Sequence, residues 1–330
     1  MIQKCYSFKV KYERISLDKC KVLTLDGGGI KGYLTAKILK NIEQSLNEFR
    51  SEDINLGQRF ELIVGTSTGG IIAAALAIGK SAKEIFELYE TLIPKVFNRS
   101  HVFGTKYSNE VLREELQNIL GDLTLADVKT GLCLTSVDVE NSSPRFHKSG
   151  YFDRNSTRLD EKLVDVVLAS AAAPTFFPLI DTLHSSNLTD GGIVANNPSL
   201  VGLIEAMQLV EGRKDDIALV SVGTGEQCHM PYNVNKLRNG GKLSWMAQCK
   251  PRNLLSNPLK HIGSPLIELL MESQSKLAHY QTQFLLGDKY LRVNPKLSVS
   301  VELDDAEKIG SLKNLADLSK SDLEQLKILL

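Results

Sequence analysis

The sequence predicts an α/β protein whose mainly parallel sheet is covered by helices on both faces. Short apolar runs alternate with longer segments of helical periodicity, and two of the turns between them are rich in glycine. No internal repeat or Pro/Gly/Ser-rich linker divides the 330 residues. Strands are expected at 21–25, 60–64, 132–139, around Leu188, 217–222 and 290–293. Helices are expected at 34–49, 71–78, 81–92, 108–120, 160–171, 199–210 and 266–284, with one or two more in 306–330.

The composition argues against several classes of protein. The 39 Lys and Arg balance the 39 Asp and Glu, so no global basic excess points to a nucleic-acid polymer as partner. The five cysteines include no Cys-x-x-Cys pair, which favours reduced thiols over a disulfide framework or a zinc site. Charged residues stand where a signal peptide would need apolar ones, and glycines interrupt the longest uncharged stretch, 62–79. We therefore expect a cytoplasmic protein without a membrane span.

The first glycine-rich turn has the sequence Asp26-Gly27-Gly28-Gly29-Ile30-Lys31-Gly32 and separates a predicted strand from a predicted helix. Such a turn directs backbone N–H groups toward the helix amino terminus, where they can stabilise an anion. Its Gly-x-Gly-x-x-Gly spacing is also typical of a dinucleotide-binding turn, with Asp53 as the ribose ligand. By itself the motif is a weak signal, because glycines that only make a tight turn give the same spacing.

The second turn has the sequence Gly65-Thr66-Ser67-Thr68-Gly69-Gly70, a Gly-x-Ser-x-Gly motif between a strand and a helix. This context is typical of a nucleophile elbow, in which a strained turn exposes the serine hydroxyl. A polar serine in a glycine-rich turn is the plainer interpretation. The elbow is favoured because the upstream glycine turn could supply the N–H donors that acyl transfer needs.

A candidate base follows much later in the chain. Asp190 ends a short apolar stretch and precedes Gly191 and Gly192, so we expect it at a strand end from which its carboxylate could reach Ser67. An aspartate before glycine is also common in ordinary turns.

Together the three segments resemble the motifs of the patatin-like phospholipase family, and the resemblance extends from about residue 21 to residue 294. It implies a three-layer α/β/α fold and a serine acyl hydrolase that cleaves fatty-acyl esters of phospholipids without a metal or a cofactor. The matching segments are 26–32 for the family's oxyanion loop, 65–69 for its elbow, 190–192 for its aspartate motif, and 172–178 and 195–198 for the flanking regions.

The resemblance also implies a role for each motif residue. Ser67 is the nucleophile and Asp190 the base of a Ser-Asp dyad, and the backbone of Gly27, Gly28 and Gly29 forms the oxyanion hole. Lys31 keeps the positive charge where the family often has arginine. The residues that complete the motifs are Asp26, Lys31, Gly32, Gly65, Gly69, Gly191 and Gly192. The catalytic domain is expected at 21–294, after an N-terminal extension at 1–20 and before a C-terminal helical segment at 295–330.

Three alternatives remain open at this point. One is an esterase triad in the order Ser, Asp, His, with His229, His261 or His279 as base, although no motif supports these histidines. The histidines that precede Asp190, His101, His147 and His184, are better explained as surface or core residues. The others are a nucleotide-binding protein that uses the glycine loop, and a lipid-binding module without catalysis. An exposed, strained Ser67 has no use in a nucleotide-binding oxidoreductase.

The segment 227–267 contains no Asp or Glu and six Lys or Arg, so we expect a basic insertion or lid there. Lys236, Arg238 and Lys242 are its candidate anion-binding residues. They could contact anionic headgroups, bind a phosphate-bearing ligand, or form a solvated basic surface.

The expected partners follow from the resemblance. Membrane phospholipids would be the substrate, met at the inner membrane surface, and the chain could form a homo-oligomer. Some bacterial family members of this size are antiviral effectors activated by a cyclic oligonucleotide, and the sequence is compatible with that role.

Overall fold

The computed structural model describes residues 16–97, 104–151, 158–227, 232–246, 248–249, 262–263 and 265–330, and the fold below is that of these residues. An eight-stranded sheet at the centre has the order β11-β7-β1-β2-β3-β6-β5, with β4 paired to β3. The pairs from β11 to β3 are parallel, whereas β4, β5 and β6 pair antiparallel. The strands are β1 Cys20–Leu25, β2 Leu62–Thr66, β3 Gly131–Asp138, β4 Ser143–Lys148, β5 Ile180–Thr182, β6 Ser185–Asp190, β7 Ile217–Val222 and β11 Tyr290–Val293.

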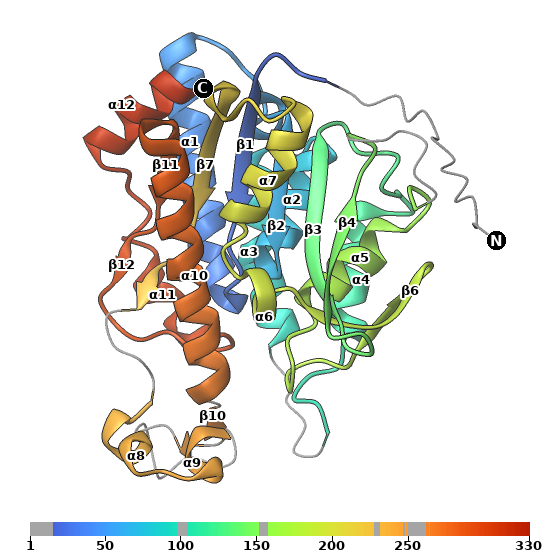
Figure 1. Cartoon of the computed structure of the whole chain (residues 1–330), viewed down its shortest axis with the longest axis vertical. Coiled ribbons are helices and arrows are strands. Elements are labelled where there is room, and N and C mark those ends of the chain that lie inside the picture. The colour runs from blue at the N-terminus through green and yellow to red at the C-terminus, as the bar shows by residue number, and fades with distance from the viewer. Residues whose placement is uncertain are drawn as a thin grey trace, which may run out of the picture.

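Helices cover both faces of this sheet, which makes a three-layer α/β/α arrangement (Figure 1). In the view of Figure 1, α7 and α10 lie in front of the sheet and α1 to α5 lie behind it. The helices are α1 Gly32–Arg50, α2 Thr68–Ala77, α3 Ala82–Val96, α4 Glu110–Leu120, α5 Leu163–Ala171, α6 Gly192–Ala195, α7 Ser199–Leu209 and α10 Pro265–Leu286. No helix within the described ranges is long and apolar enough to cross a membrane.

The core has one apolar cluster on each face of the sheet, because successive strand residues point to opposite faces. Leu23 and Ile63 belong to the cluster under α1, α2 and α5. Their neighbours Val22 and Val64 belong to the cluster under α7. Strands buried on both faces have mostly apolar residues, which explains the nearly continuous apolar runs in the sequence.

Local sequence explains the helices that flank the turns. All ten residues of α2 are buried, and its small Ala and Gly side chains allow it to pack closely against the sheet. α3 begins with a capping box in which Ser81 accepts from the Glu84 N–H and the Glu84 carboxylate accepts from the Ser81 N–H.

The segment after β11 joins the same core as the sheet. Its strand β12, Lys296–Leu297, pairs with β8, Glu226–Gln227, and α11, Ile309–Leu312, and α12, Lys320–Leu329, follow. Leu312 and Leu326 are fully buried in the cluster that contains α1. The helical prediction for this segment is therefore confirmed, and the segment is continuous with the core of the predicted catalytic domain.

The basic segment is described only in part. It contains two short helices, α8 at Val234–Arg238 and α9 at Lys242–Met246, and a small antiparallel pair of β9, Gln248–Cys249, with β10, Ile262–Gly263. Figure 1 shows α8 and α9 at the lower end of the molecule, beyond the edge toward which β1 points.

The predicted fold class, the six strands and the helices are confirmed, with ends that differ by a few residues. The sequence did not predict β4 and β5. β4 has the sequence Ser-Pro-Arg-Phe-His-Lys and only His147 of it is buried, so it lacks the apolar alternation that marks a strand.

Candidate active site

Ser67 lies in the sharp turn between β2 and α2. Its φ of 54° and ψ of −124° are a conformation that non-glycine residues rarely adopt. The expected backbone strain at the elbow is thus present, and strain of this kind is concentrated at functional positions. The side chain is 8% exposed, so the turn holds it at the boundary of the core.

The two glycines of the elbow are required by close backbone approaches. A Cβ on Gly65 would lie 2.5 Å from the carbonyl oxygen of Gly69. A Cβ on Gly69 would lie 2.3 Å from the carbonyl oxygen of Leu25 at the end of β1. Glycine at both positions therefore lets the elbow fold tightly against the neighbouring strand.

The register of β3 brings Asp190 next to this turn. Thr66, the last residue of β2, pairs with Thr135, and Asp190, the last residue of β6, pairs with Ser136. β2 and β6 therefore meet end to end along one side of β3, and Ser67 and Asp190 are adjacent although 122 residues separate them in number. The expectation that Asp190 ends a strand is confirmed.

Asp190 is 3% exposed, and its surroundings shift its acidity. Burial raises the pKa of the carboxyl group to about 6, although hydrogen bonds from the Ser67 hydroxyl and the Gly192 N–H act in the opposite direction. The Gly192 N–H donates to Asp190 Oδ1 over 2.7 Å. A Cβ on Gly191 would lie 2.1 Å from Thr135 Oγ1, so this position too requires glycine.

Ser170 of α5 joins the elbow to the aspartate motif, and the sequence analysis missed it. The Ser67 N–H donates to Ser170 Oγ over 3.0 Å. The Ser170 carbonyl oxygen accepts from the Gly191 N–H over 3.4 Å. A serine among the apolar residues in the second half of α5 was the signal that could have identified it.

The glycine loop packs against the elbow, but its three glycines differ. The Gly27 N–H already donates to the Asn196 carbonyl oxygen over 2.9 Å, which corrects the expectation that all three glycines offer free donors. Within the described part of the chain, the N–H groups of Gly28 and Gly29 donate no hydrogen bond. A Cβ on Gly32 would lie 2.1 Å from Thr68 Oγ1, so α1 begins directly against the elbow.

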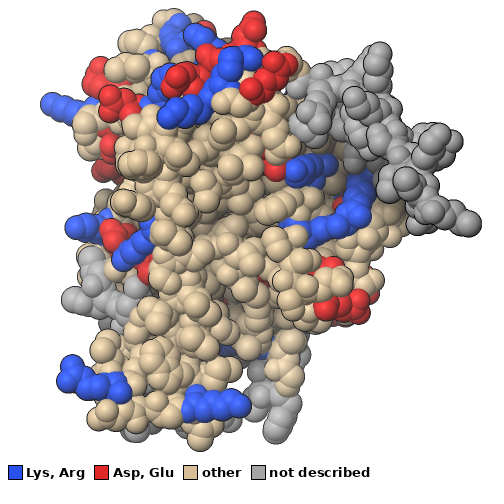
Figure 2. Space-filling model, in the orientation of Figure 1, with Lys and Arg blue, Asp and Glu red and all other residues tan. Residues whose placement is uncertain are grey.

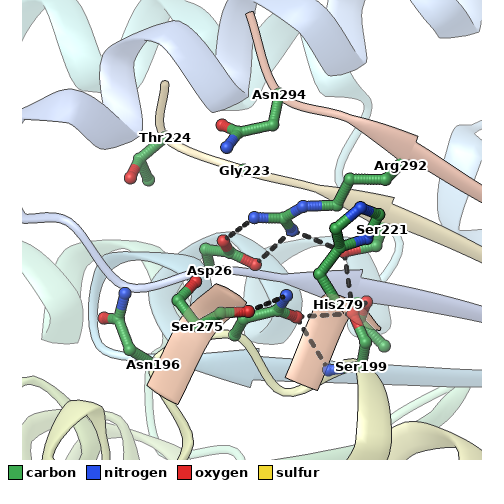
Figure 3. A network of polar contacts seen from close by, with 12 residues as sticks. Asp26, Asn196, Ser199, Ser221, Gly223, Thr224, Ser275, His279, Arg292 and Asn294 are labelled. Atoms are coloured by element: carbon green, nitrogen blue, oxygen red, sulfur yellow. Dashed lines mark hydrogen bonds and ion pairs between the residues drawn. The ribbon is translucent and has the colours of Figure 1, made fainter. Parts of the chain in front are cut away.

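Asp26, directly before this loop, is paired with a residue that sequence analysis did not find. The Arg292 guanidinium of β11 binds both carboxylate oxygens, one of them over 2.8 Å, and the pair is almost completely buried (Figure 3). Burial raises the pKa of Asp26, and the charge of Arg292 acts against that shift. Burial alone would lower the pKa of Arg292, but Asp26 outweighs it and the pKa is raised. An arginine inside an apolar strand was the signal for a buried acidic partner.

A cavity of about 330 Å³ lies behind the glycine loop, between α10 and the segment 301–303. Its described lining includes Gly28, Lys31 and Arg292, but neither Ser67 nor Asp190. Most of its lining side chains are polar or charged, which makes it unsuited to a fatty-acyl chain.

The structure also bears on the alternatives. Asp53 is exposed just beyond the carboxyl end of α1, whereas the glycine loop lies at the amino end of this helix, which is roughly 28 Å long. It is therefore no ribose ligand for this loop. His279 Nδ1 lies 3.2 Å from the Tyr290 hydroxyl, and burial, with the nearby charge of Arg292, lowers its pKa. His229 and His261 lie outside the described residues.

The histidines that were expected to be core or surface residues lie in the core or at the surface where the structure describes them. His147 is 2% exposed and lies between Ser136 and Glu161. His184 Nε2 lies 2.6 Å from Asp160 Oδ1 at the surface. His101 lies outside the described residues.

Lys236, Arg238 and Lys242 are exposed on α8 and α9, apart from the elbow. Figure 2 shows blue side chains at this lower end of the molecule and no red ones beside them in that view. The charge pattern predicted from the sequence is therefore present as a basic surface on the described part of the segment.

The patatin-like phospholipase family model matches residues 23–201, more than half of the chain. The chain belongs to the patatin-like phospholipase family. As a member it is a lipid acyl hydrolase. It is 34% identical to a cGAMP-activated phospholipase of Escherichia coli (strain TW11681) over 92% of this chain and 88% of that protein.

Two further relatives are similar over most of their length. A cGAMP-activated phospholipase of Vibrio cholerae is 32% identical, over 72% of this chain and 72% of that protein. Patatin-like protein 1 of Arabidopsis thaliana is 28% identical, over 93% of this chain and 79% of that protein. Among solved structures, VipD from Legionella pneumophila is 14% identical over 95% of this chain and 67% of VipD, with a TM-score of 0.44.

Proposed function

We propose that the chain hydrolyses fatty-acyl esters of membrane phospholipids with Ser67 as nucleophile and Asp190 as base. The observation that carries the proposal is the meeting of a strained, partly exposed Ser67 with a buried Asp190 at the shared edge of β3. Gly28 and Gly29, whose N–H groups donate to no described residue, supply the oxyanion hole.

The reaction takes place in two halves. Ser67 Oγ attacks the ester carbonyl carbon while its proton passes to Asp190, and the N–H groups of Gly28 and Gly29 stabilise the oxyanion. The leaving lysophospholipid oxygen takes the proton from Asp190, which leaves the acyl group on Ser67. Water, deprotonated by Asp190, then releases the fatty acid and restores the Ser67 hydroxyl.

The raised pKa of Asp190 suits it to this role. A fully solvated aspartate, with a pKa near 3.9, is a weak base toward a hydroxyl group. A pKa of about 6 leaves Asp190 mostly ionised at neutral pH and brings its basicity closer to that of histidine. The same group can therefore accept the proton of Ser67 and return it to the leaving oxygen.

The test is labelling by a fluorophosphonate together with mass spectrometry of fatty acids released from phospholipid vesicles. With cGAMP present, wild type should be labelled and should release fatty acid, and Ser67→Ala should do neither. Ser136→Ala is the matched control, because Ser136 is a buried serine beside the same aspartate. Labelling that persists in Ser67→Ala would overturn the assignment of the nucleophile.

The surface around α8 and α9 supports contact with a membrane. Leu243 is 83% exposed and lies next to Lys242, and Val234 and Met246 are exposed on the same short helices. Figure 2 shows that an uncharged surface continues from this end over the lower part of α10. Exposed apolar side chains beside basic ones are the combination that binds at a lipid interface.

Charge reversal tests this contact. Changing Lys236, Arg238 and Lys242 to Glu should weaken binding to anionic vesicles, because each surface cation contributes about 1 kcal/mol there. Turnover of a soluble p-nitrophenyl ester, measured without cGAMP, should stay unchanged. The control reverses three exposed lysines elsewhere, Lys83, Lys214 and Lys320, and should keep vesicle binding.

We also propose that a cyclic oligonucleotide activates the enzyme. The two similar bacterial proteins named above are cGAMP-activated phospholipases, at 34% and 32% identity. If Lys236, Arg238 and Lys242 bind its phosphates, wild type should be nearly inactive without cGAMP, and the triple reversal should no longer respond. Normal vesicle binding together with a normal cGAMP response in the triple variant would leave these residues as a solvated basic surface. A homo-oligomer remains a prediction, which light scattering with and without cGAMP would test.

A further inference from the structure

The buried pair of Asp26 and Arg292 joins the first residue of the glycine loop to the opposite end of the chain. The two residues are 266 positions apart and belong to β11 and to the end of β1. One strand, β7, lies between them, because β11 pairs with β7 and β7 pairs with β1. The contact is therefore a tertiary one, across a full strand of the sheet.

The paired hydrogen bonds from Arg292, a fork of two parallel N–H groups, hold the Asp26 carboxylate in one orientation. The two terminal nitrogens of Arg292, Nη1 and Nη2, both donate to Asp26, and Nη1 also donates to Ser221 Oγ over 2.6 Å (Figure 3). Ser221 Oγ in turn accepts a hydrogen bond from Ser199 Oγ over 2.9 Å. The position of Arg292 is therefore also fixed by Ser221 of β7 and, through it, by Ser199 of α7. Two parallel bonds to a planar cation fix the rotation of a carboxylate, which a single bond to a lysine would not do.

The backbone around Asp26 is also held on every side. The Asp26 N–H donates to the Val222 carbonyl oxygen over 3.1 Å, and the Gly27 N–H donates to Asn196. Thr224 Oγ1 donates to the Gly27 carbonyl oxygen over 3.1 Å. The loop is thus anchored up to Gly27, directly before the two glycines whose N–H groups have no described acceptor.

We infer that Arg292 is a positioning residue that sets the direction of the Gly28 and Gly29 N–H groups through Asp26. This inference rests on the proposed function, in which those groups stabilise the oxyanion. Donors of this kind act only when they point to the place that the oxyanion will occupy, so a rotation of the Asp26 side chain and its backbone weakens them. Arg292 itself touches no reacting atom.

The competing explanation is that the pair only stabilises the fold. A buried ion pair is weak evidence of stabilisation, because desolvation offsets much of its attraction. A purely structural pair would change the free energy of unfolding and leave the turnover of each folded molecule unchanged. A positioning pair lowers kcat with little change in KM, because it acts on the transition state.

The cavity behind the loop permits a direct test by chemical rescue. Arg292 is part of its lining, so Arg292→Ala opens a space that a free guanidinium ion can enter. We expect Arg292→Ala to lower kcat on a soluble p-nitrophenyl ester by about 100-fold, the loss typical of one misplaced oxyanion donor. Guanidinium at a concentration below the denaturing range should raise the kcat of Arg292→Ala about tenfold. Sodium or methylammonium at the same concentration should not raise it.

Two further variants keep the test decisive. Arg292→Lys retains the charge without the fork, and it should lower kcat about tenfold even if Arg292→Ala fails to fold. Arg59→Ala is the matched control, because Arg59 is a similarly buried arginine paired with Glu52 and lies just before the amino end of β2. It should lose stability and keep the wild-type kcat for each folded molecule.

The outcomes separate this inference from the proposed function. A wild type that, even with cGAMP present, neither reacts with fluorophosphonate nor hydrolyses the ester would overturn the proposed function. A wild type that depends on Ser67, together with unchanged kcat in Arg292→Lys, would overturn only the inference. Loss of activity in Arg292→Ala without guanidinium rescue, in a protein shown to be folded by circular dichroism, would also overturn it.

Discussion

Two serines of this protein have acidic side chains nearby, and their surroundings differ in an instructive way. Ser136 Oγ lies 2.9 Å from His147 Nε2, and His147 Nδ1 lies 3.2 Å from Glu161 Oε2. These are the residue types of a hydrolase triad, in the order in which a proton would pass. Ser67 has only Asp190 and no described histidine partner.

The two serines differ in their backbone conformation and in the exposure of their side chains. Ser136 is within the extended strand β3 and has no exposed surface. Ser67 is in a strained turn at the strand end, where a Cβ on Gly27 of the glycine loop would lie 3.2 Å from the Ser67 Cβ. A nucleophile needs a route for substrate and donors for the oxyanion, and only the strand end offers both. The serine with the richer set of partners is therefore the structural one.

The largest expected effect separates the two serines by activity. Ser67→Ala and Asp190→Asn should each lower esterase turnover by about 10⁴-fold or more, and the double variant should be no worse, because the two residues act as a unit. Ser136→Ala should keep turnover within about threefold. Initial rates on a p-nitrophenyl ester, corrected for the folded fraction, decide the matter. A Ser136→Ala variant as inactive as Ser67→Ala would reverse the comparison.

The next effect concerns stability at the buried histidine. His147→Ala leaves Glu161 buried with a lost partner, so the free energy of unfolding should fall by about 3 kcal/mol. The turnover of each folded molecule should change less than tenfold. Urea titration and initial rates measure the two quantities on the same sample. A loss of turnover without a loss of stability would assign His147 to the chemistry.

The glycine loop should show an intermediate effect. A Cβ on Gly28 would lie 2.4 Å from Thr224 Oγ1, so Gly28→Val must displace the loop and should lower kcat about 100-fold. Gly310→Val serves as control, because a Cβ there would meet no atom within 4 Å. Steady-state kinetics of both variants, with thermal unfolding to confirm the fold, make the measurement. Equal kcat in the two would remove Gly28 from the oxyanion hole.

The smallest expected effect is the pH dependence of Asp190. With a pKa of about 6, Asp190 should lose its base form below that pH, so turnover should fall about tenfold for each unit below 6 and level off above 7. A rate that stays constant from pH 5 to 8 would contradict the assigned base.

The raised pKa of Asp190 also predicts that the free energy of unfolding falls as the pH rises, whereas turnover increases. A raised pKa means that the folded state holds the Asp190 proton more tightly than the unfolded chain, whose reference pKa is 3.8. Ionising Asp190 in the folded protein therefore lowers the free energy of unfolding. This loss grows between pH 4 and pH 6 and reaches its full size above pH 6. Relative to wild type, Asp190→Asn should gain about 1–2 kcal/mol of unfolding free energy between pH 5 and pH 8. Urea titrations at the two pH values measure this difference.

Much of the fold could be predicted from local patterns. The strands at 217–222 and 290–293 have the bounds that the apolar runs indicated, and α2 follows from its alanines. β4 could not be predicted, because its pairing depends on β3 and its own sequence is polar. The elbow at Ser67 was predictable from its Gly-x-Ser-x-Gly motif, and the approach of Gly65 to the Gly69 carbonyl oxygen is local, whereas the approach of Gly69 to the Leu25 carbonyl oxygen is a tertiary contact.

By itself the sequence determined the order of strands and helices, the strained turn at Ser67 and the glycine turn before α1, because these depend on sterics and burial over a few neighbouring residues. The tertiary structure alone decided which strands became neighbours. That choice placed Asp190 beside Ser67 through the register of β3, left Ser136 and His147 without access, and paired Asp26 with Arg292. A buried charge is costly without a partner, but which distant residue supplies that partner depends on which strands become neighbours.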